Sequence, residues 1–278
     1  MIRAMTAVVV LHYERIALTA ECCATLSAQD VPTRIIVVDN GSLSHGEPEL
    51  RAALPECAEI MRLPSNVGFG RGMNAGMRAA LADPGIDSVL FLNNDTRCPP
   101  ETVRAMRAAL EADPTVGLVG CDMEGAGGGD SAPAGYRIGR IFGYPRPCRP
   151  GEAPDYLQGS CLLMPRDVLE ATGGFDEDYW FFFEDADLSF RVRRLGRRLV
   201  VAPGVRIFHY GSATMALDNV RKIEWFRAGH RIFLRKWFSF PLLRAIPPFA
   251  AGVARCLLQR RFAAAAASVR DFFSAARH

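Results

Sequence analysis

Two adjacent carboxylates, Glu184 and Asp185, stand at the start of a stretch that is typical of an amphipathic helix. Apolar residues follow them at helical spacing, at Leu188, Val192 and Leu195. Acidic residues commonly cap a first helical turn, where they meet free N–H groups and the positive end of the helix dipole. A carboxylate in that position is ionised at neutral pH. It can therefore also act as a general base that accepts a proton from an attacking hydroxyl.

An unbroken aromatic run, Tyr179 to Phe183, directly precedes this acidic pair. A loop that exposes so much apolar surface beside carboxylates is typical of a substrate cleft. We therefore predict an acceptor pocket that Trp180, Phe181 and Glu184 help to form. Helix capping alone would explain the acids if the aromatic run were absent.

A second candidate for chemistry is Asp95, which follows the hydrophobic segment Val89–Leu92 after Asn93 and Asn94. A strand that ends in an aspartate can place a divalent cation beneath a diphosphate, because Mg²⁺ prefers carboxylate and phosphate oxygens. We predict that Asp95 is a metal ligand and that Asn93 or Asn94 binds a ribose or a coordinated water. A simple strand-end turn is the alternative interpretation.

Two further segments carry residues that suit a nucleotide. The first, Asp39–Ser42, follows the apolar run Arg34–Val38, and an Asx turn is its alternative interpretation. The second is the glycine-rich loop Asn66–Gly76, where the backbone can approach a ribose or phosphate closely. This loop neither follows the first strand nor has the spacing of a dinucleotide-binding fingerprint, which argues against a dehydrogenase.

These candidates require an α/β frame that brings them together. Apolar, β-branched runs predict strands buried on both faces, and segments with helical periodicity alternate with them. Such alternation predicts right-handed βαβ units and a mainly parallel central sheet. The predicted strands are Thr6–Leu11, Arg34–Val38, Glu59–Leu63, Ser88–Leu92, Arg198–Ala202 and Val205–Phe208, and the predicted helices are Ile16–Ala28, Arg71–Leu81 and Glu101–Ala112.

The carboxyl ends of parallel strands meet at one edge of a sheet, where α/β proteins bind their ligands. We expect that edge to gather the loops Leu11–Glu14, Asp39–Ser42 and Asn93–Thr96. Between Glu124 and Pro154, glycine, proline and arginine without periodicity predict a mobile loop. This loop is either a lid or a surface excursion, and we assign it no chemistry.

Several of these segments resemble one family, the inverting glycosyltransferases with the GT-A fold (family 2 type), and especially their rhamnosyltransferase-like branch. The run from Tyr156 to Gly196 resembles the acceptor-side half of that family, and the resemblance spans Thr6 to Ser212. Three shorter segments are also similar to it: VVDNGS from Val37, NVGFGRGMNAG from Asn66 and HYGSAT from His209. The resemblance implies a GT-A, Rossmann-like nucleotide-sugar-binding fold with a helical C-terminal appendage.

The resemblance also implies roles on the nucleotide side of the site. It makes Asp39 a hydrogen-bond partner of the nucleobase and Tyr13 an aromatic residue that packs on the base. It adds Asn66 and Gly68 to the nucleotide-sugar site.

On the catalytic side, the resemblance makes Asp185 the catalytic base and lets His209 join Asp95 at a Mg²⁺ or Mn²⁺ ion. Imidazole suits manganese better than magnesium. The family's metal motif is often DxD, whereas this chain has Asn93 at the first position, so one negative charge is missing.

The predicted function is inverting transfer of a sugar from a nucleoside diphosphate sugar, with dTDP-rhamnose or a UDP-sugar favoured. The acceptor is a hydroxyl of a glycan, a lipid-linked molecule or a small molecule. Two alternatives stay open. A nucleotidyltransferase would use a similar sheet and metal but release pyrophosphate, and a non-catalytic scaffold protein would only bind sugar nucleotides.

Composition bounds the organisation of the chain. Its 278 residues, 49% hydrophobic and 23% charged, are enough for one large domain or one domain with an appendage. The resemblance and the helical pattern of the tail together imply a catalytic domain over residues 1–218 and a helical C-terminal region over residues 219–278. Eight cysteines without CxxC pairs argue against a zinc cluster or a disulfide framework and favour a reducing compartment. We see neither a secretory signal nor a membrane-spanning segment, so we expect a cytoplasmic protein.

The C-terminal region is strongly basic, with twelve Lys and Arg against two acids, whereas the rest of the chain has 21 against 28. Aromatic residues such as Trp225, Trp237 and Phe262 are interleaved with these charges. One interpretation is a peripheral, amphipathic surface at the inner face of an anionic membrane, which suits an acceptor carried on a lipid. The other is packing against the catalytic domain or a second subunit of a homodimer. Nucleic acid is not an expected partner, because no binding motif accompanies the charge.

Overall fold

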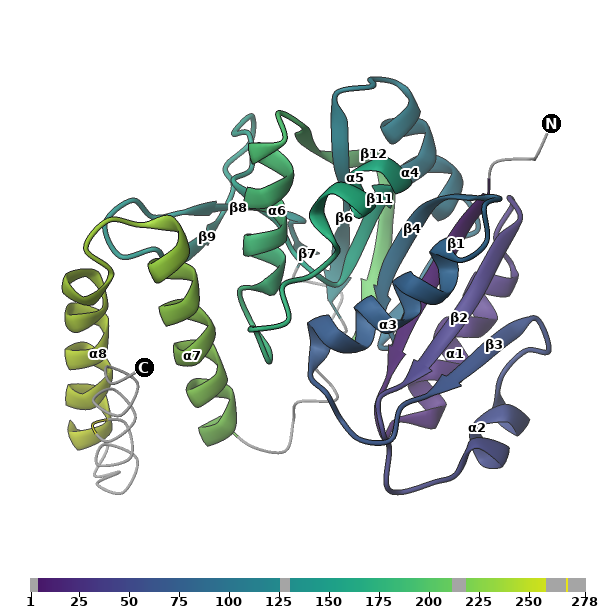
Figure 1. Ribbon diagram of the computed structural model, residues 1–278, viewed down its shortest axis with the longest axis horizontal. Helices are drawn as coiled ribbons and strands as arrows, with labels where there is room; N and C mark the ends of the chain where they lie inside the picture. The colour runs from purple at the N-terminus through teal and green to yellow at the C-terminus, as the bar shows by residue number, and fades with distance from the viewer. Residues whose placement is uncertain (1–4, 126–130, 212–218, 259–268, 270–278) are drawn as a thin grey trace.

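The computed structural model describes residues 5–125, 131–211, 219–258 and 269 (Figure 1). Its main sheet has nine strands, in the order β3-β2-β1-β4-β11-β6-β12-β5, with β7 paired to β6. These strands are β1 (Met5–His12), β2 (Thr33–Asp39), β3 (Ala58–Arg62), β4 (Ile86–Asn93), β5 (Thr96–Arg97), β6 (Val116–Gly125), β7 (Ser131–Ala132), β11 (Cys161–Pro165) and β12 (Arg198–His209).

Strand pairing in this sheet is mainly parallel. β1 pairs in parallel with β2 and β4, β2 with β3, and β6 with β12. β11 runs antiparallel between β4 and β6. The predicted α/β fold with a mainly parallel central sheet is therefore confirmed. The two short strands predicted between Arg198 and Phe208 are one strand, β12, whose register against β6 shifts between Val201 and Arg206.

Helices cover both faces of the sheet, which explains why its strands read as continuous apolar runs. Along β1, Val8 and Val10 join one buried apolar cluster, and Ala7 and Val9 join the other. The helices of the main body are α1 (Ile16–Ser27), α2 (Glu47–Ala53), α3 (Phe69–Leu81), α4 (Thr102–Glu111), α5 (Arg166–Thr172) and α6 (Glu184–Arg194).

A small second sheet lies where the sequence predicted a loop without regular structure. It contains β8 (Gly135–Ile138), β9 (Pro145–Pro147) and β10 (Tyr156–Leu157), in the order β10-β8-β9. The loop prediction is therefore wrong for this part of Glu124–Pro154, while residues 126–130 lie outside the described residues. Strands of two to four residues are too short to display the alternating pattern that identifies a strand.

Two helices follow the main body, α7 (Asn219–Trp237) and α8 (Pro241–Leu258), and Figure 1 shows α7 between α6 and α8. Phe233 of α7 is fully buried in a third apolar cluster with Tyr179 and Phe183. The first helix of the basic region thus packs on the main body, and the division at residue 218 stays a prediction. Phe262 and the segment Ser212–Thr214 lie outside the described residues.

Within the described part of the chain, no helix combines the length and the apolar character that crossing a bilayer requires.

Candidate active site

The carboxyl ends of β1, β2 and β4 lie side by side, as the strand pattern predicted. In the parallel register His12 lies opposite Asp39, and Leu11 lies opposite Asn93. The loops beyond the strand ends are also joined, because the backbone N–H of Asn40 donates to the carbonyl of His12 at 2.9 Å. The fold therefore gathers the predicted nucleotide and metal loops at one edge of the sheet.

The Asp39 carboxylate is fully buried and already has protein partners. One oxygen accepts the N–H of Ser42 at 3.0 Å, and the other accepts Nη1 of Arg62 at 2.7 Å. Arg62 also donates to the carbonyls of Ser42 and His45, so it fixes the loop after β2. Tyr13 lies partly buried in the neighbouring loop. Nucleobase binding by Asp39 and Tyr13 remains a prediction.

Glu14 holds the same loop from the other side. Its backbone is left-handed, with φ of 61°, which is unusual for a residue other than glycine. Its carboxylate accepts the N–H groups of Leu43 at 2.7 Å and Ser44 at 3.0 Å. Although burial raises the pKa of Glu14, these hydrogen bonds lower it below its ordinary value overall. An ionised Glu14 therefore fixes the loop at the predicted nucleotide site.

The two asparagines ahead of Asp95 have different surroundings. Asn94 is buried, and its amide donates to the hydroxyl of Thr19 at 2.9 Å. Asn93 is partly exposed, and its amide donates to the hydroxyl of Ser160 at 3.3 Å. Of the two, Asn93 is therefore the better placed to meet a ribose.

The glycine-rich loop serves two different purposes. Asn66 and Gly68 precede α3, where the Asn40 amide donates to the Asn66 side chain at 3.2 Å and to the Gly68 carbonyl at 3.1 Å. Gly68 has φ of 89°, and a Cβ there would lie 2.8 Å from the carbonyl oxygen of Trp180. By contrast, a Cβ on Gly72 would lie 2.5 Å from Leu11 of β1. Gly72 thus allows α3 to pack against the sheet and does not face the predicted nucleotide.

The fold brings Asp95 and His209 together, although 114 positions separate them in the chain. β5 pairs with the end of β12, so His209 Nε2 lies 3.1 Å from Asp95 Oδ1. Both side chains are largely buried, with 12% of His209 and 4% of Asp95 exposed. Nε2 has no hydrogen-bond partner among the described residues, so the two atoms face each other without hydrogen-bond geometry.

This pair suits a divalent cation, because a carboxylate oxygen and an imidazole nitrogen converge on one point. No group of three or more His, Cys, Asp or Glu side chains placed to hold a metal occurs in the residues that the structure describes. The remaining positions around such an ion would be left to diphosphate oxygens and water, as is common for Mg²⁺.

Asp185 lies at the first turn of α6, with its carboxylate held by backbone N–H groups. Oδ2 accepts the N–H of Gly159 at 2.9 Å, and Oδ1 accepts that of Ala186 at 2.7 Å. Burial raises the pKa of Asp185 to about 6, although these two hydrogen bonds oppose the shift. The neighbouring Ser160 carbonyl accepts the N–H of Asn93 at 3.0 Å, which ties the carboxylate to the end of β4.

Glu184 differs from its neighbour in the partners of its carboxylate. It is only 6% exposed, and its Oε2 has no hydrogen-bond partner among the described residues. Burial, and then the charge of Asp185, raise the pKa of Glu184 well above its ordinary value. Burial therefore favours the protonated form of Glu184, which makes Asp185 the better candidate for accepting a proton. The predicted contact of Glu184 with the acceptor remains a prediction.

This difference predicts the effect of Glu184→Gln. Glutamine is neutral and of similar shape, so the variant should transfer sugar with a loss well below the roughly 100-fold that removing a general base causes. Steady-state kcat, measured at pH 8 beside the wild type, checks the expectation. A loss as large as that of Asp185→Asn would show that Glu184 acts as an ionised group.

Aromatic side chains from two parts of the chain meet beside the acid pair. Trp180 is 42% exposed, and Phe181 is partly buried against the apolar cluster that contains Phe69. Trp225 of α7 lies with its ring centroid 6.4 Å from that of Trp180 and 6.1 Å from that of Phe181. The acceptor pocket remains a prediction, and Trp225 joins the residues that we expect to form it.

Four residues of this site were not predicted from the sequence: Glu14, Arg62, Gly159 and Trp225. Glu14 and Arg62 bind backbone groups of a loop, and the conformation of a loop leaves no periodic pattern in the sequence. Gly159 is a single glycine whose N–H carries the contact. Trp225 was part of the basic and aromatic pattern of the tail, but that pattern does not reveal which element the ring meets.

Comparison with known proteins agrees with this geometry. The model of Glycosyl transferase family 2 matches residues 7–173 of the chain. The chain is also 28% identical over 260 residues to the N-acetylglucosaminyl-diphospho-decaprenol L-rhamnosyltransferase of Mycobacterium tuberculosis, covering 79% of this chain and 81% of that relative. It is 26% identical over 168 residues to the low-salt glycan biosynthesis hexosyltransferase Agl10 of Haloferax volcanii, covering 57% and 53% respectively.

Solved structures share the fold at low sequence identity. Residues 1–349 of TarS from S. aureus align with a TM-score of 0.56 and 17% identity, covering 83% of this chain and 72% of that one. The mannosyltransferase PcManGT of Pyrobaculum calidifontis, solved with GDP-Man and Mn²⁺, aligns with a TM-score of 0.55 and 17% identity, covering 98% and 86%. The chain belongs to glycosyl transferase family 2, as a rhamnosyltransferase-like enzyme with the GT-A fold that moves a sugar from a nucleotide-sugar donor.

Proposed function

We propose that the transfer is inverting and that Asp185 is its general base. Asp185 takes the proton of an acceptor hydroxyl as that oxygen attacks the anomeric carbon of the donor sugar. The bond between the anomeric carbon and the phosphate oxygen breaks at the same time, and the nucleoside diphosphate leaves with the bonding electrons. Attack from the face opposite the leaving group inverts the anomeric centre.

Asp95 and His209 would hold a Mg²⁺ or Mn²⁺ ion beneath the donor diphosphate. When bound, the ion would offset the negative charge that grows on the departing phosphate. The 3.1 Å approach of His209 Nε2 to Asp95 Oδ1 supports this assignment, and so does the absence of a hydrogen-bond partner for Nε2 among the described residues.

The single observation that carries this proposal is a short series of backbone contacts that connects Asp185 to Asp95. Asp185 accepts from Gly159, and the next residue, Ser160, binds Asn93 at the end of β4. Asp95 follows Asn93 by two residues. A base and a cation site on one short backbone path is the arrangement that transfer from a nucleoside diphosphate sugar requires.

We propose a deoxythymidine diphosphate rhamnose donor and an acceptor sugar carried on a lipid diphosphate. The support is similarity to the mycobacterial relative, whose name gives it rhamnosyl transfer to N-acetylglucosaminyl-diphospho-decaprenol. On this chain the donor diphosphate would lie at Asp95, and Trp180, Phe181 and Trp225 would contact the acceptor.

The test is a binding and product panel with the sugar nucleotides of UDP, dTDP and GDP, with and without Mn²⁺. Selective binding of one nucleotide should raise the melting temperature, because a ligand of the folded state stabilises it by mass action. Chromatography of the products should find a nucleoside diphosphate. Release of pyrophosphate would replace this proposal with a nucleotidyltransferase, and failure of every nucleotide to bind would contradict it altogether.

A lipid-linked acceptor predicts that the protein reaches a membrane surface. Four exposed apolar residues of α8 recur at four-residue spacing, Ile246, Ala250, Ala254 and Leu258, and Leu257 beside them is also exposed. Leu258 is 86% exposed, and the region around it is basic. We propose that this face lies on anionic lipid.

The double change Ile246→Asp and Leu258→Asp should weaken binding to vesicles that contain phosphatidylglycerol by at least about tenfold, since both side chains leave the apolar layer. Leu195→Asp is the matched control, because Leu195 is 46% exposed, as Ile246 is, but caps the C-terminal end of α6. Sedimentation with the vesicles measures the effect. Equal binding of all three proteins would contradict the proposed membrane face.

A further inference from the structure

Two consecutive aromatic residues directly before the acid pair have left-handed backbones. Phe182 has φ of 68° and Phe183 has φ of 70°. Bulky side chains rarely adopt this conformation, and strained residues persist only where the surrounding structure fixes them. The carbonyl of Phe183 also accepts the N–H of Asp187 at 2.9 Å, so this residue sets the direction in which α6 begins.

Helix α7 supplies the contacts that fix this pair. A Cβ added to Gly229 would collide with the carbonyl oxygen of Phe182 and would lie 3.3 Å from that of Phe181. Gly229 therefore lets the backbone of α7 press directly on the strained loop. Beside it, the ring of Phe183 packs against three α7 side chains, with centroid distances of 5.1 Å to Phe226, 5.2 Å to His230 and 5.5 Å to Phe233.

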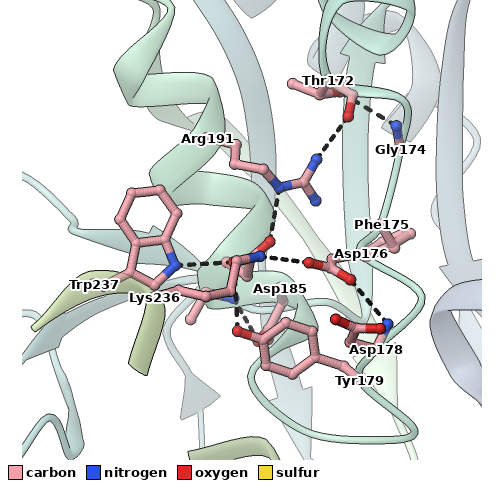
Figure 2. Close-up of polar contacts among 12 residues, drawn as sticks. Thr172, Gly174, Phe175, Asp176, Asp178, Tyr179, Asp185, Arg191, Lys236 and Trp237 are labelled. Atoms are coloured by element: carbon pink, nitrogen blue, oxygen red, sulfur yellow. Dashed lines mark hydrogen bonds and ion pairs between the residues drawn. The ribbon is translucent and has the colours of Figure 1, made fainter. Parts of the chain in front are cut away.

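The end of α7 binds Asp187, which lies two residues after Asp185. Trp237 Nε1 donates to Asp187 Oδ1 at 2.9 Å, and Lys236 Nζ lies 2.6 Å from the same oxygen. Figure 2 shows both α7 side chains reaching the first turn of α6, and Lys236 also contacts Asp176 in the loop that precedes α6. Asp187 is fully buried, so these partners and Arg191 neutralise a charge that has no access to water.

We propose that α7 positions the catalytic base: it holds the loop at Phe182–Phe183 through Gly229 and the first turn of α6 through Trp237, and so fixes the direction of the Asp185 carboxylate. Gly229 and Trp237 are positioning residues, because they act through the backbone and side chains that flank Asp185. This role rests on the proposed function of Asp185 as the base.

Gly229→Ala tests the first contact. The added methyl group must displace the Phe182 backbone, and a misplacement of the base by about 1 Å is expected to lower kcat about 100-fold, with the donor KM within a few fold of wild type. Gly252→Ala is the matched control. It makes the same change on α8, where the new Cβ meets only the flexible end of Arg227, and it should behave as wild type.

Trp237→Phe tests the second contact, because it removes the indole N–H and keeps an aromatic ring in place. It still tests the proposal if Gly229→Ala does not fold. Hydrogen exchange of the amides of residues 182–187 provides a readout that needs no turnover. We expect faster exchange in both variants, together with the lower kcat and an unchanged donor KM. Exchange or kcat equal to that of Gly252→Ala in both variants would overturn the positioning role.

The two proposals fail in different ways. If the wild type transfers no sugar from any donor while exchange still quickens in the variants, the proposed function fails and the contact of α7 with the loop stands. If the wild type turns over and the variants match it, α7 has no role in positioning the base.

Discussion

Asp185→Asn is expected to remove sugar transfer and leave nucleotide binding intact. Asparagine keeps the size of the side chain and one oxygen, which can accept from one of the two N–H groups of Gly159 and Ala186, but its amide cannot take a proton from the acceptor hydroxyl. Loss of a positioned general base lowers a rate by roughly 10²- to 10⁴-fold. We expect the upper part of this range, because the adjacent Glu184 is almost fully buried and burial favours its protonated form.

The measurement is kcat with a saturating donor, and calorimetric titration with the nucleoside diphosphate serves as the binding control. Glu184→Gln is the matched variant, since it makes the same chemical change one residue away. Near-normal turnover in Asp185→Asn would remove this residue from the role of base. Loss of nucleotide binding would mean that the variant disturbs the fold and does not isolate the chemistry.

The pKa of Asp185 also sets the pH dependence of the wild type. Burial raises this pKa to about 6, and a base works only when it is deprotonated. Hence kcat/KM should rise as the pH passes through about 6 and level off above it. The effect on stability has the opposite sign. A folded-state pKa above the ordinary value of an aspartate favours folding at low pH, and that contribution is lost as the pH rises through about 6.

The sequence predicted the frame of this enzyme because the frame depends on strong, periodic signals. Thr6–Leu11 lies within β1, and a strand buried on both faces must be apolar throughout. The carboxyl ends of adjacent parallel strands must meet, so the association of Asp39 with the loop of Asn93 followed from strand order. The contact of His209 with Asp95 did not follow from strand order, because it depends on a two-residue strand, β5.

Other parts of the site could not be predicted because they depend on tertiary contacts that have no sequence period. In the sequence, Phe182 and Phe183 are simply two aromatic residues, and nothing indicates that their backbones are left-handed. Gly229 lies inside a helix, where glycine is unfavourable, and the neighbouring sequence does not explain why it is there. Only the packing of α7 on the Phe182 carbonyl explains it. Arg62, which binds the buried Asp39, lies at the end of an exposed strand and has no distinguishing neighbours.

Asp95→Ala should abolish the benefit of the metal for both donor binding and transfer. Among the described residues, Asp95 supplies the only carboxylate beside His209 Nε2. The metal motif also lacks one negative charge, because its first position is Asn93. A single remaining imidazole leaves either Mg²⁺ or Mn²⁺ without its carboxylate ligand, so the protein holds the ion at one point only. We expect kcat/KM with Mn²⁺ to fall about 10³-fold, which corresponds to the several kcal/mol that a metal contributes at a departing phosphate.

The decisive comparison is the response to metal, measured as donor affinity and kcat/KM in Mn²⁺ and after treatment with EDTA. The wild type should lose activity in EDTA, whereas Asp95→Ala should be equally weak in both conditions. Asp113→Ala controls for the loss of an acidic side chain at the surface, since the Asp113 carboxylate accepts hydrogen bonds from Thr115 and Arg198. Combining Asp95→Ala with His209→Ala should add little to the defect, since two ligands of one ion act as a unit. Additive losses, or a variant that still responds to Mn²⁺ as the wild type does, would show that the cation binds elsewhere.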